Sequence, residues 1–220
     1  MITKAKKEAI DFPKILYVGA SGKGKTYSFR NMDENTTGFI NVELKPLPFK
    51  KTFKYHAKPK QFAGVLKALE DYAANPEIDV IVIDSLSAVF EILLKEARDT
   101  YANFEIWNFY NKKIGELLNK VKLVEKEVFV TAHYEILTNE DDAEKRVKVK
   151  GKEWEGMIEK EFTFVLYAED KFKGDKGEYF LKLAGEGISA KCPPDVFGSD
   201  IMKVDNDSKV VLDKIRAFYN

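Results

Sequence analysis

The 220-residue sequence predicts an α/β protein in which a mostly parallel β-sheet is flanked by helices. Two observations predict this class. Short runs rich in β-branched and aromatic residues alternate with longer stretches of helical period. A glycine-rich segment directly follows the first of these runs, as it does where a strand turns into a phosphate-binding loop. The length fits a single domain over residues 1–220, with a core at about 13–197.

The expected strands are short apolar runs, most of them separated by helical stretches. Five of them lie at 14–18, 38–42, 52–56, 80–83 and 127–132. Two further runs, 162–168 and 178–183, flank the segment 173–177, which contains two glycines. This arrangement predicts a C-terminal β-hairpin.

Three segments have the pattern of helices. Residues 60–74 and 104–124 place apolar side chains on one face at helical spacing, and 208–219 has the pattern of a closing helix. The segment 138–155 has no consistent period and is dense in charge. We therefore expect a long surface loop there.

Composition excludes some classes of protein. Lys+Arg and Asp+Glu are equal at 36 each, so a binding site for a polyanion has to be local. The single Cys192 excludes an intramolecular disulfide and a multi-cysteine metal site, which suits a reducing compartment. The sequence has no apolar run long enough for a membrane span, so we expect a soluble, cytoplasmic protein without a membrane partner.

The glycine-rich segment matches G-x-x-x-x-G-K-[ST] at every specified position, after an apolar run and before a segment that can be helical. Glycines allow a tight turn in which backbone N–H groups and a helix N-terminus face a phosphate. Lys25 can then reach the β- and γ-oxygens, and Thr26 can offer its hydroxyl to Mg²⁺. The sequence thus predicts a P-loop NTPase that uses ATP and Mg²⁺; a glycine-rich turn without a ligand is the alternative. The expected nucleotide-binding residues are Gly19, Ala20, Ser21, Gly22, Lys23, Gly24, Lys25, Thr26 and Tyr27.

A second motif supports the first. The apolar run 79–85 has a carboxylate, Asp84, near its end, which is the Walker B pattern. There the carboxylate orients Mg²⁺ through its water shell, so Asp84 joins Thr26 as a candidate metal-site residue. A strand-terminal aspartate by itself is often only a helix cap, but downstream of a P-loop it indicates a metal site.

Residues 38–43 and 79–89 resemble the RecA-type ATPase core. More narrowly, the chain resembles the small phage RecA-like ATPases of the Sak group, which are associated with single-strand annealing recombination. The resemblance covers about 13–197. It implies an ATPase that acts on single-stranded DNA as a homo-oligomer or filament, encoded by a phage and located in the host cytoplasm.

The resemblance also implies catalytic roles. In RecA-type cores a carboxylate after the P-loop helix activates the attacking water, which implies that role for Glu43. The position that senses the γ-phosphate holds His133 here, where RecA has a glutamine. Together with Lys25 these are the catalytic candidates. An exposed loop glutamate and a structural histidine are the alternatives.

RecA-type proteins carry a DNA-contacting loop after the sensor strand, and a basic cluster follows it here. The DNA-binding candidates are Lys145, Arg146, Lys148, Lys150 and Lys152. Lysines can follow a phosphate backbone and Trp154 could stack on a base, although a charge run is usually only solvated surface. The family also supplies a cation from a neighbouring subunit, for which Lys182 and Lys191 are candidates.

Two other functions remain open. One is a P-loop kinase for a small molecule, but such kinases usually hold phosphates with several arginines. This chain has only Arg30, Arg98, Arg146 and Arg216. The other is an assembly module that is switched by ATP and does not bind DNA.

Overall fold

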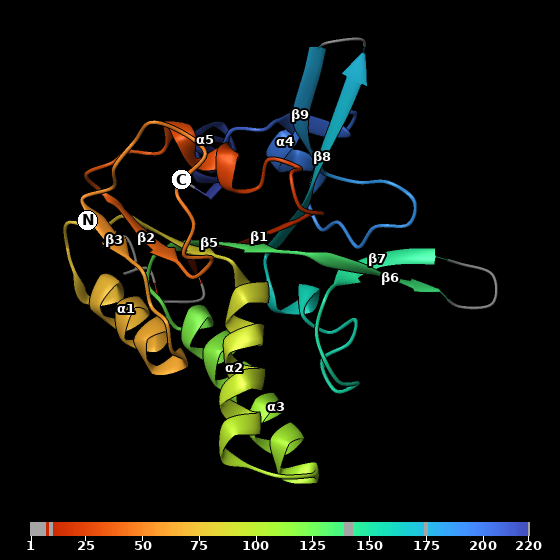
Figure 1. Cartoon of the computed structure of the whole chain (residues 1–220). Coiled ribbons are helices and arrows are strands. Elements are labelled where there is room, and N and C mark those ends of the chain that lie inside the picture. The colour runs from red at the N-terminus through yellow and green to blue at the C-terminus, as the bar shows by residue number, and fades with distance from the viewer. Residues whose placement is uncertain (1–7, 9–10, 139–142, 174–175, 220) are drawn as a thin grey trace.

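The computed structural model describes residue 8 and residues 11–138, 143–173 and 176–219. An eight-stranded sheet with the order β10-β9-β8-β1-β5-β4-β2-β3 forms its centre (Figure 1). Its strands are β1 (Lys14–Val18), β2 (Thr37–Asn41), β3 (Tyr55–Ala57), β4 (Val80–Asp84), β5 (Glu127–Ala132), β8 (Phe164–Lys173), β9 (Lys176–Lys182) and β10 (Lys203–Asp205). All pairings from β8 to β3 are parallel, and the β8–β9 and β9–β10 pairings are antiparallel. The predicted mostly parallel sheet with a C-terminal hairpin is confirmed.

Helices cover both faces of this sheet (Figure 1). One face carries α1 (Phe62–Ala74), α2 (Leu86–Thr100) and α3 (Phe104–Lys122). The other carries the 3₁₀ helix η2 (Thr26–Asn31), α4 (Pro194–Phe197) and α5 (Ser208–Tyr219). A further short 3₁₀ helix, η3, spans Glu159–Glu161. Among the described residues, no helix is long and apolar enough to cross a membrane.

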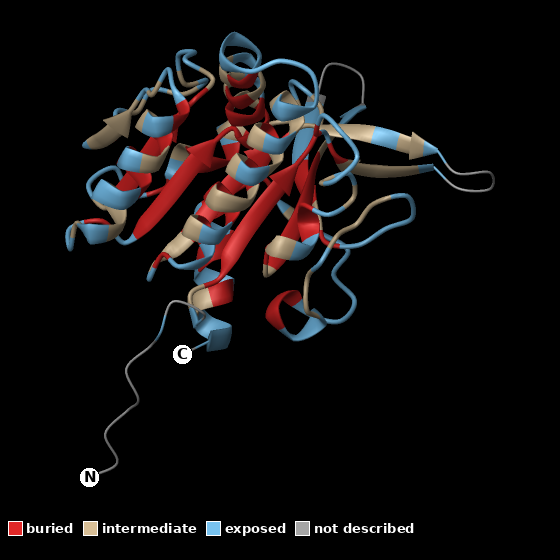
Figure 2. Ribbon diagram, turned by 90° about the horizontal axis from the view of Figure 1, so that it is seen from below, coloured by how far each residue is buried: buried red, intermediate tan, exposed pale blue. Residues whose placement is uncertain are grey.

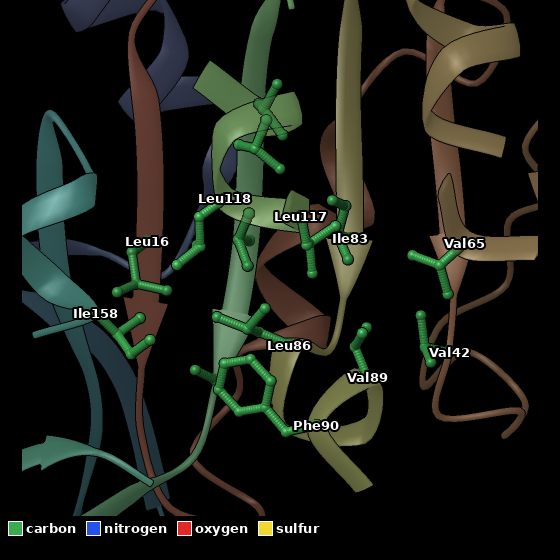
Figure 3. Packing of buried hydrophobic residues seen from close by; sticks show 14 of the residues in the cluster. Leu16, Val42, Val65, Ile83, Leu86, Val89, Phe90, Leu117, Leu118 and Ile158 are labelled. Carbon is green, nitrogen blue, oxygen red and sulfur yellow. The ribbon is translucent and has the colours of Figure 1, made fainter. Parts of the chain in front are cut away.

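The core has two layers because side chains alternate along each strand. In β1, Leu16 and Val18 point to the layer under α1, α2 and α3, whereas Ile15 and Tyr17 point to the layer under η2 and α5. Figure 2 shows the buried strands between helices whose outer sides are exposed. Figure 3 shows residues of α2 and α3 packed against the strands in the first layer. The central strands β1, β2, β4 and β5 are buried on both faces, which explains their continuous apolar runs.

The second layer is rich in aromatic rings. Phe29 of η2 lies with its ring centroid 5.9 Å from Tyr17, 5.9 Å from Phe39 and 5.8 Å from Phe129. All four side chains are fully buried. Phe29 therefore ties the short helix that follows the glycine-rich loop to three strands of the sheet.

Several elements differ from the sequence-based expectations. The predicted loop at 138–155 is wrong in part, because Tyr134–Thr138 (β6) and Ala143–Val147 (β7) pair as an antiparallel hairpin; residues 139–142 lie outside the described part. This hairpin is a separate two-stranded sheet whose cross-strand pairs include Glu135 with Arg146, so it lacks an apolar alternation that the sequence could reveal. The elements α2, α4 and β10 were not predicted. For α2 a signal existed, since Leu86, Val89, Phe90 and Leu93 follow helical spacing.

We expect Phe129→Ala to lower the free energy of unfolding by about 3–5 kcal/mol, because it leaves a cavity between the rings of Tyr17 and Phe29. The matched control is Phe104→Ala, whose ring is 72% exposed and which should change stability by less than about 0.5 kcal/mol. Urea denaturation of both variants measures the difference. Equal midpoints for the two variants would contradict the assigned core.

Candidate functional site

Strands β1, β2, β4 and β5 end at the same edge of the sheet, and a cavity of about 710 Å³ opens there. Parallel α/β sheets bind ligands at this edge. The cavity is lined by Ser21, Gly22, Gly24, Lys25, Thr26, Tyr27, Asn41, Glu43, Lys45, Pro46, Leu47, Pro48, Asp84, Ser85, His133, Gly177 and Tyr179. The structure therefore brings most of the predicted nucleotide-binding residues together with Asp84, Glu43 and His133.

The conformation of the loop after β1 requires its glycines. Gly22 and Gly24 have φ angles of +80° and +82°, which side chains on L-residues rarely allow. Gly19 is needed for a different reason, since a Cβ there would lie 2.8 Å from the carbonyl oxygen of Ala168 in β8. The motif thus encodes a backbone path that other residues could not follow.

The far C-terminal part of the chain holds this loop in place. Asn206 Nδ2 donates a hydrogen bond to the carbonyl oxygen of Gly24 at 3.0 Å. Ser208 Oγ and Ser28 Oγ lie 2.8 Å apart, and the guanidinium of Arg30 donates to the carbonyl oxygen of Asn206. Asn206 was not predicted, because no local pattern links it to a loop 182 residues away.

The helix expected after the loop is short. Instead of an α-helix, residues 26–31 form the six-residue 3₁₀ helix η2. Tyr27, Ser28 and Phe29 are only moderate helix formers, and Ser28 Oγ donates to the carbonyl oxygen of Lys25 at 2.6 Å. Anion binding at this site must therefore rely on the N–H groups of the loop and on Lys25 rather than on a long helix dipole.

Lys25 is buried, with 7% of its surface exposed. Its ammonium donates to the carbonyl oxygens of Gly19 at 2.7 Å and Ala20 at 2.9 Å, and it lies 3.3 Å from His133 Nδ1. Burial lowers the pKa of Lys25 to about 8, although the nearby carboxylates offset part of this effect. A ligand with negative charge would raise this pKa again.

Asp84 and Thr26 form the metal-type end of the cavity. Thr26 Oγ1 donates to Asp84 Oδ2 at 2.9 Å, and Thr131 Oγ1 donates to Asp84 Oδ1. Burial raises the pKa of Asp84, and the hydrogen bonds from the two threonines counteract this. A carboxylate next to a threonine hydroxyl provides the oxygen ligands that Mg²⁺ prefers. The predicted pair therefore fits that ion.

Glu43 is half-buried at the cavity, so it is not simply an exposed loop residue. Its Oε1 accepts a hydrogen bond from Ser85 Oγ at 2.5 Å, and its Oε2 lies 2.9 Å from Lys45 Nζ. Burial is the largest effect on the pKa of Glu43 and would raise it, but the hydrogen bonds from Ser85 and Lys45 and nearby positive charge together lower it. Ser85 and Lys45 were not predicted from the sequence. They hold the carboxylate ionised and oriented.

His133 lies between the ammonium of Lys25 and the carboxylate of Glu43. Its Nε2 is 3.9 Å from Glu43 Oε1, and its backbone N–H donates to Ser87 Oγ at 2.8 Å. Burial, followed by the charge of Lys25, lowers the pKa of His133. The imidazole is therefore neutral near pH 7 and can donate from only one ring nitrogen.

The DNA-binding candidates lie outside this cavity and divide into two groups. Lys145 pairs with Glu169 at 2.6 Å, and Arg146 pairs with Glu144 at 2.9 Å. The remaining candidates are exposed, and the described residues give them no ion-pair partner; they are Lys148, Lys150 and Lys152. The indole of Trp154 packs on α3 and donates to the carbonyl oxygen of Asn111 at 3.2 Å, so it makes an internal contact.

The two candidates for a cation supplied in trans lie away from the cavity. Lys191 Nζ donates at 2.8 Å to the carbonyl oxygen of Phe162, which precedes β8 at the opposite edge of the sheet. The role of Lys191 toward a neighbouring subunit stays a prediction. Lys182 sits at the end of β9 between Tyr167 and Lys203. Its role stays a prediction.

Comparisons with known proteins agree with this geometry. Residues 11–191 match the model of a family described as the AAA domain. No curated protein matches the chain. Among solved structures, a KaiC-like protein from the hyperthermophilic archaeon Pyrococcus horikoshii OT3 is similar, with a TM-score of 0.51 and 11% identity over 81% of this chain and 80% of that one. At this identity the similarity shows the fold alone, which is RecA-like.

The lowered pKa of Lys25 predicts a pH dependence of nucleotide binding. Phosphate oxygens beside the ammonium raise its pKa, so above pH 8 binding must take up a proton. We expect the affinity for MgATP to fall above pH 8, approaching tenfold per pH unit. Calorimetry at pH 7, 8 and 9 in buffers of different ionisation enthalpy measures both the affinity and the proton uptake.

Lys25→Ala provides the control for this experiment. It should bind MgATP weakly at every pH, because the loop has lost its only buried ammonium among the described residues. An affinity of the unaltered protein that stays constant from pH 7 to 9 would contradict the assigned environment of Lys25.

Proposed function

The chain belongs to the AAA domain family. We propose that it hydrolyses ATP and acts on single-stranded DNA in recombination or annealing. The phage Sak-type ATPases that it resembles are associated with this process. One observation carries the ATPase part of the proposal. Lys25, Thr26, Asp84 and Glu43, which come from three separate segments, converge on one cavity at the carboxyl edge of the sheet.

Each part of the site has a role in this proposal. The N–H groups of the loop and Lys25 would hold the β- and γ-phosphates, and Thr26 with Asp84 would hold Mg²⁺. When bound, the metal ion neutralises negative charge that develops on the phosphate oxygens. Glu43 is placed to orient a water molecule and to accept its proton at a carboxylate oxygen.

The hydrogen bonds from Ser85 and Lys45 fix the rotamer of Glu43. They also lower its pKa, so the carboxylate is ionised at neutral pH and can both position the water and accept its proton. The neutral ring of His133 lies with its Nδ1 3.3 Å from Lys25 Nζ, so it is placed to contact a γ-phosphate that binds beside the ammonium. These contacts give the reaction an ordered geometry before a substrate arrives.

A direct backbone contact supports the DNA part of the proposal. The N–H of Lys148 donates to the carbonyl oxygen of His133 at 2.8 Å, so the first of the exposed lysines is bonded directly to the candidate sensor residue. Lys148, Lys150 and Lys152 are exposed, and neutralising phosphates with exposed lysines favours binding through counterion release. Lys145 and Arg146 instead form ion pairs within the protein, with Glu169 and Glu144.

The arginines weigh against the kinase alternative. All four lie in the described part of the chain, and none lines the cavity. Arg30 binds the backbone of Asn206, Arg146 pairs with Glu144, and Arg216 pairs with Glu127 near the opposite edge. No arginine is therefore positioned to hold a phosphate donor and acceptor together.

We expect Glu43→Gln to bind MgATP as tightly as the parent and to hydrolyse it about 10²-fold or more slowly, because the amide keeps the shape and loses the basicity. Calorimetry measures the affinity and single-turnover hydrolysis measures the chemical step. The control is Glu77→Gln, whose carboxylate is 64% exposed in an ion pair with Lys54, and it should keep the parental rate. A parental rate for Glu43→Gln would show that Glu43 has no catalytic role.

The DNA proposal predicts that replacing Lys148, Lys150 and Lys152 together by glutamine weakens binding to a labelled oligonucleotide. Three fewer phosphate contacts should reduce the slope of log K against log salt by about 2 for a single strand. The matched control replaces Lys67, Lys95 and Lys209, whose ammonium groups pair with aspartates one helical turn away.

The same experiment includes the ATPase rate over a range of protein concentrations, with and without oligonucleotide. If the protein acts as a homo-oligomer on DNA, as we propose, its specific ATPase activity rises with protein concentration and on addition of the oligonucleotide. Oligonucleotide binding that is absent at low salt, with ATP hydrolysis intact, would leave an ATP-switched assembly module as the function.

A further inference from the structure

We propose that the base of the nucleotide binds beside Tyr27 and Tyr179, which form one end of the cavity, and that it is recognised by its aromatic face rather than by its hydrogen-bonding edge. The hairpin of β8 and β9 then supplies a wall of the nucleotide site. This inference rests on the proposed function, since it concerns the same cavity.

The sheet order defines two ends of the cavity. Asp84, Glu43 and His133 come from β4, from the residues after β2 and from the end of β5, all of which lie on one side of β1. Tyr179 comes from β9, which lies on the other side of β1 beyond β8. Both ends belong to the same cavity of about 710 Å³.

A nucleoside triphosphate is a linear ligand, so its orientation follows from these two ends. With the β-phosphate at the glycine-rich loop and the γ-phosphate beside Asp84 and Glu43, the sugar and base must extend in the opposite direction. That direction leads past Thr26 to the next residue, Tyr27, and toward Tyr179.

The two rings are close and partly exposed. Their centroids lie 6.4 Å apart with the ring planes tilted by 50°, and 39% of Tyr27 and 37% of Tyr179 is accessible. Exposed aromatic rings at the lip of the cavity offer a flat apolar surface on which a base can stack.

Contacts with other parts of the protein hold both rings in position. The guanidinium of Arg30 lies 4.5 Å from the ring centroid of Tyr27. The ring of Tyr179 packs on the loop, because a Cβ on Gly24 would lie 3.0 Å from its Cδ1. Asp170, the partner of Tyr179 in the strand pairing, forms an ion pair with Lys23 of the loop. The hairpin wall is therefore attached to the phosphate-binding loop.

The side chains at this end of the cavity predict weak base selectivity. Apart from the two tyrosine hydroxyls, the described residues that line this end of the cavity are Gly24 and Gly177, which have no side chain to read a base edge. The amide of Asn206 is buried behind Gly24 and donates to that residue's carbonyl oxygen. Discrimination between adenine and guanine needs hydrogen bonds to the base edge, whereas stacking accepts either purine. A single-ring pyrimidine offers less area for stacking.

The test compares MgATP with magnesium tripolyphosphate, which carries the phosphates and no base. Tyr27→Ala and Tyr179→Ala should each weaken MgATP binding about 10-fold and leave tripolyphosphate binding unchanged. Tyr27→Phe and Tyr179→Phe should keep the parental affinity for both probes, because the ring and not the hydroxyl makes the contact. The matched control is Tyr101→Ala, a tyrosine of similar exposure, 38%, at the end of α2.

Calorimetry on these variants separates the two hypotheses. If neither MgATP nor tripolyphosphate binds the parent protein, the proposed function fails. If both bind and the alanine variants keep the parental affinity for MgATP, the base site is overturned while the phosphate site stands.

The parent protein provides a second test that needs no variant. We expect MgATP and MgGTP to bind within about fivefold of each other and MgUTP more weakly than either. An affinity for MgATP more than about 100-fold above that for MgGTP would overturn recognition by the face of the base.

Discussion

The buried carboxyl group of Asp84 is the point at which the parts of the site are joined. Its side chain accepts hydrogen bonds from Thr26 in the glycine-rich loop and from Thr131 in β5. Its backbone oxygen accepts from the N–H groups of Val42 at 2.7 Å and Glu43 at 3.2 Å. One residue therefore sets the relative positions of the loop, the neighbouring strand and the segment that carries the catalytic candidate. Because burial raises its pKa, a cation at this position would also be electrostatically favourable.

The glycine-rich loop is held by tertiary contacts on several sides. Phe29 attaches the short helix after the loop to the aromatic layer, and Asn206 and Ser208 attach it to the start of α5. Asp170 in β8 pairs with Lys23 in the loop. A phosphate-binding loop works best when its N–H groups are already oriented, since no free energy is then spent on ordering them during binding. These contacts replace the support that a long helix would provide.

The position of His133 connects two regions with different chemistry. Its ring lies beside Lys25 at the cavity, and its carbonyl oxygen accepts from the N–H of Lys148 at the start of the exposed basic segment. The hairpin β6–β7 runs between these two residues. On the other side of this hairpin, Lys145 pairs with Glu169, the neighbour of Asp170 in β8. Direct contacts therefore extend from the loop toward the basic segment through His133 and through the ion pairs that β8 makes with Lys23 and Lys145.

Local chemistry was enough to predict several parts of this protein from the amino-acid sequence. Buried parallel strands are continuous apolar runs, so β1, β5 and the carboxylate of Asp84 could be placed in advance, and the glycine motif encodes its own backbone path. The groups that surround these residues became known only from the folded chain. Ser85 and Lys45 at Glu43, Asn206 at the loop and Tyr179 at the end of the cavity come from other elements or carry no motif of their own. Most of these contacts join residues that are far apart in the sequence, so they cannot be predicted from local periodicity and motif spacing.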